Sequence, residues 1–271
     1  MEPPGTPGWF LAKAGRVRKP NMDLHPPPPV ELVDKPNENA TLSSIELQSQ
    51  THSEEGSIWK MVGDADGNSI MKLLRKRPEY LFKRDDVGAT PLLFLSLLKS
   101  DRHLRVAKKV ILQYQERILD QYSEGPYEGE NLLHIAIVNE NLEFAKFLVQ
   151  KAPQLLEQQA VGSFFSSDGG SCPWGAFPLS FAAATNQTDM VDVCLRGGAK
   201  VFAEDCDGMT ALHIAVVAGF ADTYAMLADA ADASASSEKL KDIRRSCLHT
   251  AVASGQLEIF EMLLDRSKKE M

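Results

Sequence analysis

Long apolar runs are missing from this sequence of 271 residues. The densest apolar stretch, residues 92–98, is interrupted by Ser96, whereas a membrane-spanning helix needs about 18–20 apolar residues. The N-terminal residues also lack a basic segment followed by an apolar one, the pattern of a secretory signal peptide. We therefore expect neither a membrane-spanning helix nor a signal peptide in this chain.

Positive charge and cysteine are scarce as well. Lys and Arg number 29 against 37 Asp and Glu, giving a net charge of −8, and this balance disfavours nucleic acid as a partner because such binders normally carry a basic face. No C-x-x-C pair occurs, and no histidine lies at zinc-binding spacing from a cysteine. We expect reduced, mostly buried thiols in a cytosolic protein. The four cysteines are Cys172, Cys194, Cys206 and Cys247.

Motifs of catalysis do not stand out either. The sequence shows no Ser–His–Asp arrangement, no paired carboxylates and no phosphate-binding glycine loop. We therefore predict that the protein is not an enzyme, and we assign no catalytic residue and no metal ligand.

Two short strings repeat each other and indicate the fold. Residues 129–136 read GENLLHIA and residues 208–215 read GMTALHIA, and both match the G-x-T-P-L-H-x-A opening of an ankyrin repeat. Stacked ankyrin repeats present a concave recognition surface and carry no chemistry of their own. We predict an all-α ankyrin-repeat solenoid of about six helix-turn-helix units with long loops between them.

The spacing of the repeat openings is irregular. The opening positions Gly88, Gly129, Gly175, Gly208 and Arg245 are 41, 46, 33 and 37 residues apart, against about 33 in the ankyrin consensus. The excess must lie in longer second helices or in loops. A degenerate first unit precedes them, with helices predicted at residues 58–62 and 69–77 that end before a proline. The predicted units lie near residues 57–82, 88–120, 129–152, 175–200, 208–231 and 245–266, within an ankyrin-repeat domain of residues 57–271.

Residues 1–56 have a different composition and are predicted to be a disordered N-terminal tail. They hold nine of the fifteen prolines, including the run at residues 26–29, and little patterned apolar content. The run is either part of a flexible tail or a polyproline II ligand for an SH3 or WW module.

Three histidines occupy matching positions in different repeats: His134, His213 and His249. Stacking would separate them by about 10 Å, the thickness of a helix pair. They cannot then converge on a metal or a substrate. We predict that they hydrogen-bond turn backbone between repeats.

The segment between the third and fourth units resembles a known family. Residues 160–165 read AVGSFF and residues 173–187 read PWGAFPLSFAAATNQ. They are similar to the G-x-F-F and F-G-E-L-P-L-S-L-A-A-C-T-N-Q strings of vanilloid-subfamily transient receptor potential (TRP) cation channels. Residues 127–137 resemble a repeat opening of the family, residues 81–88 resemble the segment that leads into its second repeat, and the likeness spans residues 57–265.

The resemblance implies a function and a cellular location. In that family, six ankyrin repeats form the N-terminal cytoplasmic domain of a tetrameric, calcium-permeable channel, with projecting loops called fingers; residues 153–174 would form one. The repeats serve subunit contacts and regulatory binding, including calmodulin and ATP in some members. The pore region would follow beyond Met271, so we expect a fragment, a truncated gene model or a product without the pore.

The alternative to a channel domain is a freestanding ankyrin scaffold. It would bind a protein through its concave face, with the proline-rich tail as a further docking site. In either case we expect the chain to be cytoplasmic, and at the cytoplasmic face of the plasma membrane if it is part of a full channel.

The resemblance also implies two residues that would contact a nucleotide. ATP-binding members carry a lysine at the position of Lys83 and an aromatic residue at that of Tyr127, so ATP as a regulatory ligand would contact these two. The lost positive charge and the added Glu130 disfavour it, and no resident cofactor is predicted. The positions that depart from the family pattern are Gly56, Ala89, Glu130 and Val138.

A cluster of basic residues lies in and after the second predicted helix. It would contact acidic lipid or a partner's acidic loop, or would simply be solvated. The cluster consists of Lys72, Arg75, Lys76, Arg77, Lys83 and Arg84.

Overall fold

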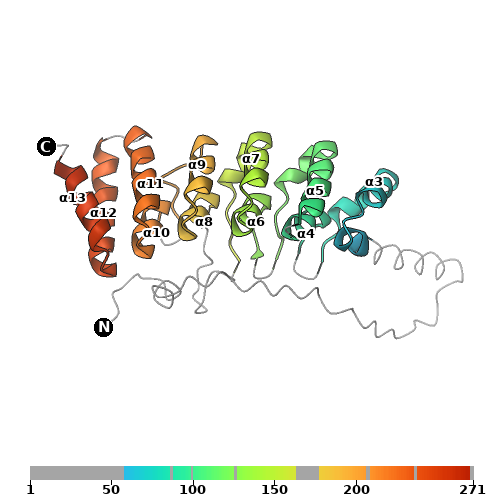
Figure 1. The fold of residues 1–271 in the computed structure, drawn as a ribbon, viewed down its shortest axis with the longest axis horizontal. Coiled ribbons are helices and arrows are strands. Elements are labelled where there is room, and N and C mark those ends of the chain that lie inside the picture. Colours follow the sequence, from blue (N-terminus) through green and yellow to red (C-terminus); the bar gives the residue numbers. More distant parts are fainter. Residues whose placement is uncertain are drawn as a thin grey trace, which may run out of the picture.

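The helices of the chain stand side by side in one row (Figure 1). A computed structural model describes residues 58–85, 88–98, 100–124, 127–162, 177–205, 208–234 and 237–268. The predicted disordered tail, residues 1–56, lies outside the described residues. Within them there is no β-strand, only an isolated bridge between Gln121 and Asn131. Likewise, no helix in these ranges is both long and apolar enough to cross a membrane.

The described helices form six successive pairs, each with an inner helix followed by an outer one, so the predicted ankyrin solenoid is confirmed. In order, the pairs are the helical residues 58–63 with α3 (Gly67–Lys76), α4 (Pro91–Leu97) with α5 (Asp101–Gln113), α6 (Leu132–Val138) with α7 (Leu142–Lys151), α8 (Pro178–Ala184) with α9 (Thr188–Arg196), α10 (Ala211–Ala218) with α11 (Ala221–Ser234), and α12 (Ser237–Ser254) with α13 (Leu257–Lys268).

The local sequence explains where the inner helices begin. Thr90 caps α4 by accepting the Leu93 N–H, and Pro91 follows in the first turn, where a missing N–H costs little. Small residues then let neighbouring inner helices approach closely. Ala182 and Ala183 of α8 and Ala215 of α10 are completely buried. The row of inner helices therefore contributes to one continuous core.

The extra residues between units form short 3₁₀ helices, which the sequence did not predict. They follow the first three outer helices and are η1 (Pro78–Phe82), η2 (Gln115–Leu119) and η4 (Pro153–Glu157). Each buries one or two apolar side chains, such as Leu81, Ile118 and Leu155. The wide spacing of the early repeats thus adds core contacts as well as loops.

The predicted opening of the last unit at Arg245 is wrong. Helix α12 begins at Ser237, so Arg245 lies in the middle of a helix of 18 residues. Residues 237–254 contain neither glycine nor proline, the residues that most often end or kink a helix. Only residues 235 and 236 separate α11 from α12, so the sixth pair lacks an entry loop as long as the one that precedes α4.

Polar side chains in the turns join each repeat to the one before it. The Asn139 amide donates to the carbonyl oxygens of Ser96 and Leu97 at 3.2 and 3.3 Å. Gln187 does the same to Ile137 at 2.9 Å. The acceptors lie at or just before the C-terminal end of an inner helix, where carbonyl groups lack intrahelical partners. His103 and Gln256 make the corresponding contacts with Gly63 and Val217.

Three inter-helix turns hold a non-glycine residue in left-handed backbone, at Ala65, Glu140 and Asn186. Glu140 has φ of +57°, whereas Gly219 and Gly255 occupy the corresponding turns of later repeats. Left-handed backbone costs a non-glycine residue about 1 kcal/mol or more. We expect Glu140→Gly to stabilise the protein by about 1 kcal/mol, despite the greater chain entropy of glycine. Urea unfolding followed by circular dichroism measures this, and an unchanged or lower midpoint would contradict it.

Candidate functional site

The loops that lead from one repeat into the next inner helix form the candidate site, and we call them finger turns. The first spans residues 83–90, the second 120–131, the third 158–177 and the fourth 203–210. In the first turn, the Asp85 backbone N–H donates to the Ala89 oxygen at 3.0 Å, and the Asp85 carboxylate accepts the Ala89 N–H at 2.7 Å. Gly88 supplies the left-handed residue, with φ of +77°. The fourth turn repeats this arrangement with Asp205, Gly208 and Met209.

The second finger turn is longer and touches the third. Within it, the Tyr122 N–H donates to the Glu130 oxygen at 2.9 Å. The N–H groups of Val161 and Gly162 both donate to the Glu128 oxygen, at 2.7 and 2.9 Å. These backbone contacts fix the described part of the third turn, residues 158–162, against the second.

An arginine and a buried carboxylate fix the second turn against the repeat before it. The Arg84 guanidinium donates to the backbone oxygens of Gly88 and Gln121, in the first and second turns. Asp120 accepts hydrogen bonds from Arg117 and from the Thr90 hydroxyl. Burial raises the pKa of Asp120, and these two donors oppose the rise. Three successive turns are therefore joined by contacts that a flexible loop would not make.

The predicted nucleotide contacts lie on these turns. Lys83 is exposed at the end of η1, and Tyr127 is half-buried in the second turn with its ring 5.6 Å from that of Tyr122. Arg84 joins the two turns, so the fold connects the elements that carry both residues. The neighbouring Ala89 is buried and supplies no charge. Nucleotide binding by Lys83 and Tyr127 stays a prediction.

In the sequence, Glu130 is only an added negative charge, and its burial is visible only in the structure. Its side chain is 6% exposed, and among the described residues its Oε1 has no hydrogen-bond partner. Burial raises the pKa of this carboxyl group to about 8. A carboxyl group of this kind is neutral at acidic and neutral pH, so at neutral pH it adds little negative charge to the site.

The buried carboxyl group makes stability depend on pH. The unfolded chain ionises Glu130 near pH 4.5, whereas the folded chain keeps it protonated to about pH 8. The stability that it contributes is thus fully present below pH 4.5 and is lost as the pH rises towards 8. We expect Glu130→Gln to gain about 2–4 kcal/mol over the wild type at pH 8.5 but almost nothing at pH 4.5. Thermal melts at both pH values test this, and equal differences would contradict it.

Two of the three matching histidines act as predicted. His134 Nδ1 accepts the Asn131 N–H at 3.1 Å, and His213 Nδ1 accepts the Thr210 N–H at 3.2 Å. His213 Nε2 also lies 2.9 Å from the Ser246 hydroxyl of the next repeat. His249 differs: it is exposed on α12, where no turn backbone is available because the helix is continuous. The prediction for His249 is therefore wrong.

The predicted cysteine chemistry is confirmed for the two cysteines within the described ranges. Cys194 and Cys247 are buried free thiols, and burial raises the pKa of each to about 12. They are therefore poor nucleophiles and poor metal ligands at neutral pH. Cys172 and Cys206 lie outside the described residues.

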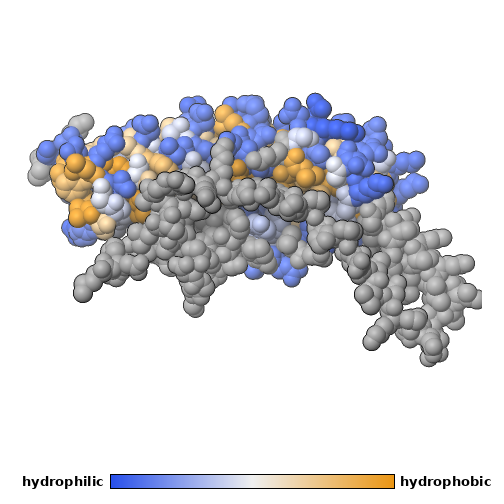
Figure 2. Space-filling model, turned by 60° about the horizontal axis from the view of Figure 1, so that its bottom comes forward, coloured by the Kyte–Doolittle hydropathy of each residue, from blue (hydrophilic) through white to orange (hydrophobic). Residues whose placement is uncertain are grey.

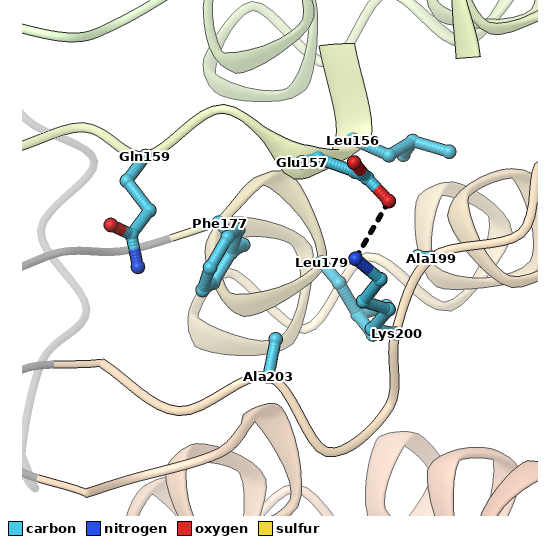
Figure 3. A pocket seen from close by; sticks show the side chains of 8 residues that line it. All are labelled: Leu156, Glu157, Gln159, Phe177, Leu179, Ala199, Lys200 and Ala203. Carbon is cyan, nitrogen blue, oxygen red and sulfur yellow. Dashed lines mark ion pairs between the residues drawn. The ribbon is translucent and has the colours of Figure 1, made fainter. Parts of the chain in front are cut away.

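A shallow depression lies between η4, the start of α8 and the loop after α9, and Gln159 and Phe177 of the third finger turn and Ala203 of the fourth border it (Figure 3). Its volume is about 260 Å³. Figure 3 shows Glu157 and Lys200 pointing at each other across one side, at 2.8 Å, with Phe177 and Ala203 away from this pair. Both charged side chains are more than half exposed, so the pair adds little stability. The volume is at the small end for a ligand pocket, and it suits one side chain of a partner protein.

Comparisons with known proteins agree with the architecture. The family model for ankyrin repeats (3 copies) matches residues 154–239 and 179–271. Over 163 residues, the chain is 32% identical to transient receptor potential cation channel subfamily V member 2 of Homo sapiens, covering 54% of this chain and 21% of that protein. It is 30% identical over 164 residues to subfamily V member 1 of Canis lupus familiaris (55% and 19%), and 29% identical over 154 residues to subfamily V member 6 of Homo sapiens (57% and 20%). The matched segments span about a fifth of these relatives.

Proposed function

The chain carries ankyrin repeats similar to those of vanilloid-subfamily TRP channels, and from this premise we propose that it acts in the assembly and regulation of such a channel by binding another polypeptide through its finger turns. Ankyrin repeats in general bind proteins, and neither they nor TRP channels are enzyme families. To this general protein-binding role, the proposal adds a specific partner and a specific binding surface. The partner would be a channel subunit, in a homo- or hetero-tetramer held together by a pore region.

The observation that carries the proposal is the mutual fixation of the first three finger turns. Arg84 bridges the first two, and Glu128 receives two N–H groups from the third. A surface that is rigid before binding loses less conformational entropy on association. Exposed charged side chains lie on the first two of these turns (Lys83, Arg84, Glu124 and Glu128) and on the fourth turn (Glu204).

The finer parts of the proposal rest on the family resemblance. Because the matched segments span only about a fifth of the relatives, calcium permeability and a cytoplasmic position beneath the plasma membrane are proposed for the assembled channel. Calmodulin and ATP are proposed regulatory ligands, the latter through Lys83 and Tyr127. An SH3 or WW protein is the proposed partner of the proline run at residues 26–29.

Co-purification tests the proposal. The tagged full chain is co-expressed with full-length subfamily V member 2 of Homo sapiens, and the detergent-solubilised complex is quantified. We expect retention of the channel subunit. The triple variant Glu124→Lys, Glu128→Lys, Glu204→Lys should retain at least about tenfold less channel subunit. Charge reversal at an interface typically costs more than about 1.4 kcal/mol of binding free energy. Asp189→Lys, Asp222→Lys, Glu258→Lys makes the same change in net charge away from the turns and should bind normally.

Two results would contradict the channel assignment. One is the absence of co-purification at matched expression. The other is equal loss with both triple variants, which would indicate a dependence on net charge instead of the turns. A freestanding scaffold is the alternative, and a soluble partner bound through the same turns in cells that lack the channel would favour it.

A further inference from the structure

The outer helices carry a charge gradient along the array. Helix α3 has three basic and no acidic residues, and α5 has four basic and one acidic. Helix α7 has two basic and one acidic, α9 one basic and two acidic, and α11 three acidic and no basic residues. The net charge thus falls steadily from the second repeat to the fifth, although the chain as a whole is acidic.

The positive end of this gradient is only weakly compensated: hydrogen bonds from Ser69 lower the pKa of the Asp66 carboxyl group, and the charge of Arg102 adds to this effect. The six basic side chains that we call the basic outer face are exposed, and within the ranges that the structure describes none of them makes a hydrogen bond or an ion pair. At the acidic end, Asp229 and Asp232 of α11 pair with Arg266, at 2.6 and 2.8 Å. The basic outer face consists of Lys72, Arg75 and Lys76 on α3 and Arg102, Arg105 and Lys109 on α5.

Three other members of the predicted basic cluster have different surroundings. Arg84 binds the backbone of two finger turns, Arg77 is half-buried at the end of α3, and Lys83 lies on the first turn. The basic cluster predicted from the sequence therefore separates into three residues on α3 and three residues with other contacts. Its α3 half lies near residues of α5 that come some 25–35 positions later in the chain, because Gly67 at the start of α3 faces the Val106 side chain.

The basic outer face is broad and has no groove. Packed helices lie about 8–10 Å apart, and seven residues of helix span about 10 Å, so the six cations cover a patch wider than one extended peptide. The two described cavities are both bordered by residues after position 155 and lie elsewhere. Leu112 is 53% exposed and follows Arg105 and Lys109 at helical spacing, so it extends the same stripe. In Figure 2 the end of the array that carries α3 and α5 is mostly hydrophilic.

We propose that the basic outer face binds the surface of an anionic lipid bilayer, with Leu112 entering the headgroup region. A broad patch of solvated cations beside one exposed apolar side chain matches a flat anionic surface, whereas an acidic peptide would need a groove to hold it. Each Lys or Arg near such a surface strengthens binding by about fivefold. The acidic α11 would be repelled, so the array would contact the bilayer with its first two repeats and tilt its later repeats away.

Vesicle sedimentation with the full chain tests the proposal. Vesicles with about 30% phosphatidylserine in phosphatidylcholine are compared with pure phosphatidylcholine. We expect at least tenfold stronger binding to the anionic vesicles, falling several-fold between about 50 and about 300 mM NaCl as the charges are screened. Leu112→Ala should weaken binding a further few-fold without changing its salt dependence.

Matched triple variants locate the contact. Lys72→Glu, Arg105→Glu, Lys109→Glu should abolish the preference for phosphatidylserine. Lys239→Glu, Lys241→Glu, Arg245→Glu makes the same change in net charge on α12 and should keep it. All six side chains are exposed, so both variants should fold, which circular dichroism verifies. Equal binding to both kinds of vesicle, or equal loss in both variants, would overturn the proposal. So would binding of soluble polyglutamate without binding of anionic vesicles, since that would indicate an acidic polypeptide partner.

Discussion

Replacing Gly129 by alanine is expected to lower the melting temperature by about 6–12 °C, corresponding to about 3 kcal/mol in a domain of this size. Gly129 has φ of +81°, which costs a side-chain-bearing residue about 1–2 kcal/mol. A Cβ atom there would also lie 2.3 Å from the Gln159 oxygen and 3.0 Å from the Val161 nitrogen. Backbone atoms cannot rotate away as a side chain can, so the second and third finger turns would have to separate.

Gly208 provides the matched control. Its φ of +72° is nearly the same, but among the described residues no atom beyond its chain neighbours lies within 4 Å of a Cβ built on it. Gly208→Ala should therefore cost only the backbone term, about 1–2 kcal/mol. Melting followed by circular dichroism compares the two variants. Equal effects would show that the second and third turns are not held together as described.

Replacing Ala183 by aspartate is expected to unfold the central repeats. Ala183 is completely buried in α8, which contacts α6 on one side and α10 on the other. A carboxylate there would have no partner, and burying an unpaired charge costs more than about 4 kcal/mol. Because each repeat is stabilised by its neighbours, we expect the loss to spread to both adjacent repeats and to reduce helicity at room temperature.

Ala253, exposed on α12, gives the control for this substitution. Ala253→Asp should change stability by no more than about 0.5 kcal/mol, as surface substitutions usually do. Helicity measured by far-ultraviolet circular dichroism compares the two. A wild-type melting curve for Ala183→Asp would mean that α8 does not face the core in the register described above.

The sequence predicted the fold well where the signals are local. The strings around His134 and His213 placed α6 and α10, and the opening predicted at Gly88 lies just before the start of α4 at Pro91. The sixth repeat was placed less accurately, because likeness to the earlier repeats put its opening at Arg245 although nothing there ends a helix. The 3₁₀ helices were also missed, since their five residues carry no periodic pattern and are stabilised by packing against neighbouring repeats.

The candidate site was less predictable because its contacts are not local. Arg84 was grouped with a basic cluster, but its role depends on Gln121, 37 residues later. Glu130 was expected to add negative charge, and its burial, which keeps it neutral, is a property of the folded second turn. The three α5 members of the basic outer face come near those of α3 only in the folded chain, where Gly67 of α3 faces Val106 of α5. Sequence patterns identify such residues, but the fold determines which of them act together.

Hydrogen–deuterium exchange of the full chain, alone and bound to subfamily V member 2 of Homo sapiens, tests the central claim most directly. That claim is that the finger turns form the surface that binds a channel subunit. It predicts that binding slows exchange in residues 83–89, 121–131 and 204–210 while leaving the outer helices α7, α9 and α11 unchanged. Slower exchange confined to the outer helices, or none at saturating partner, would contradict it.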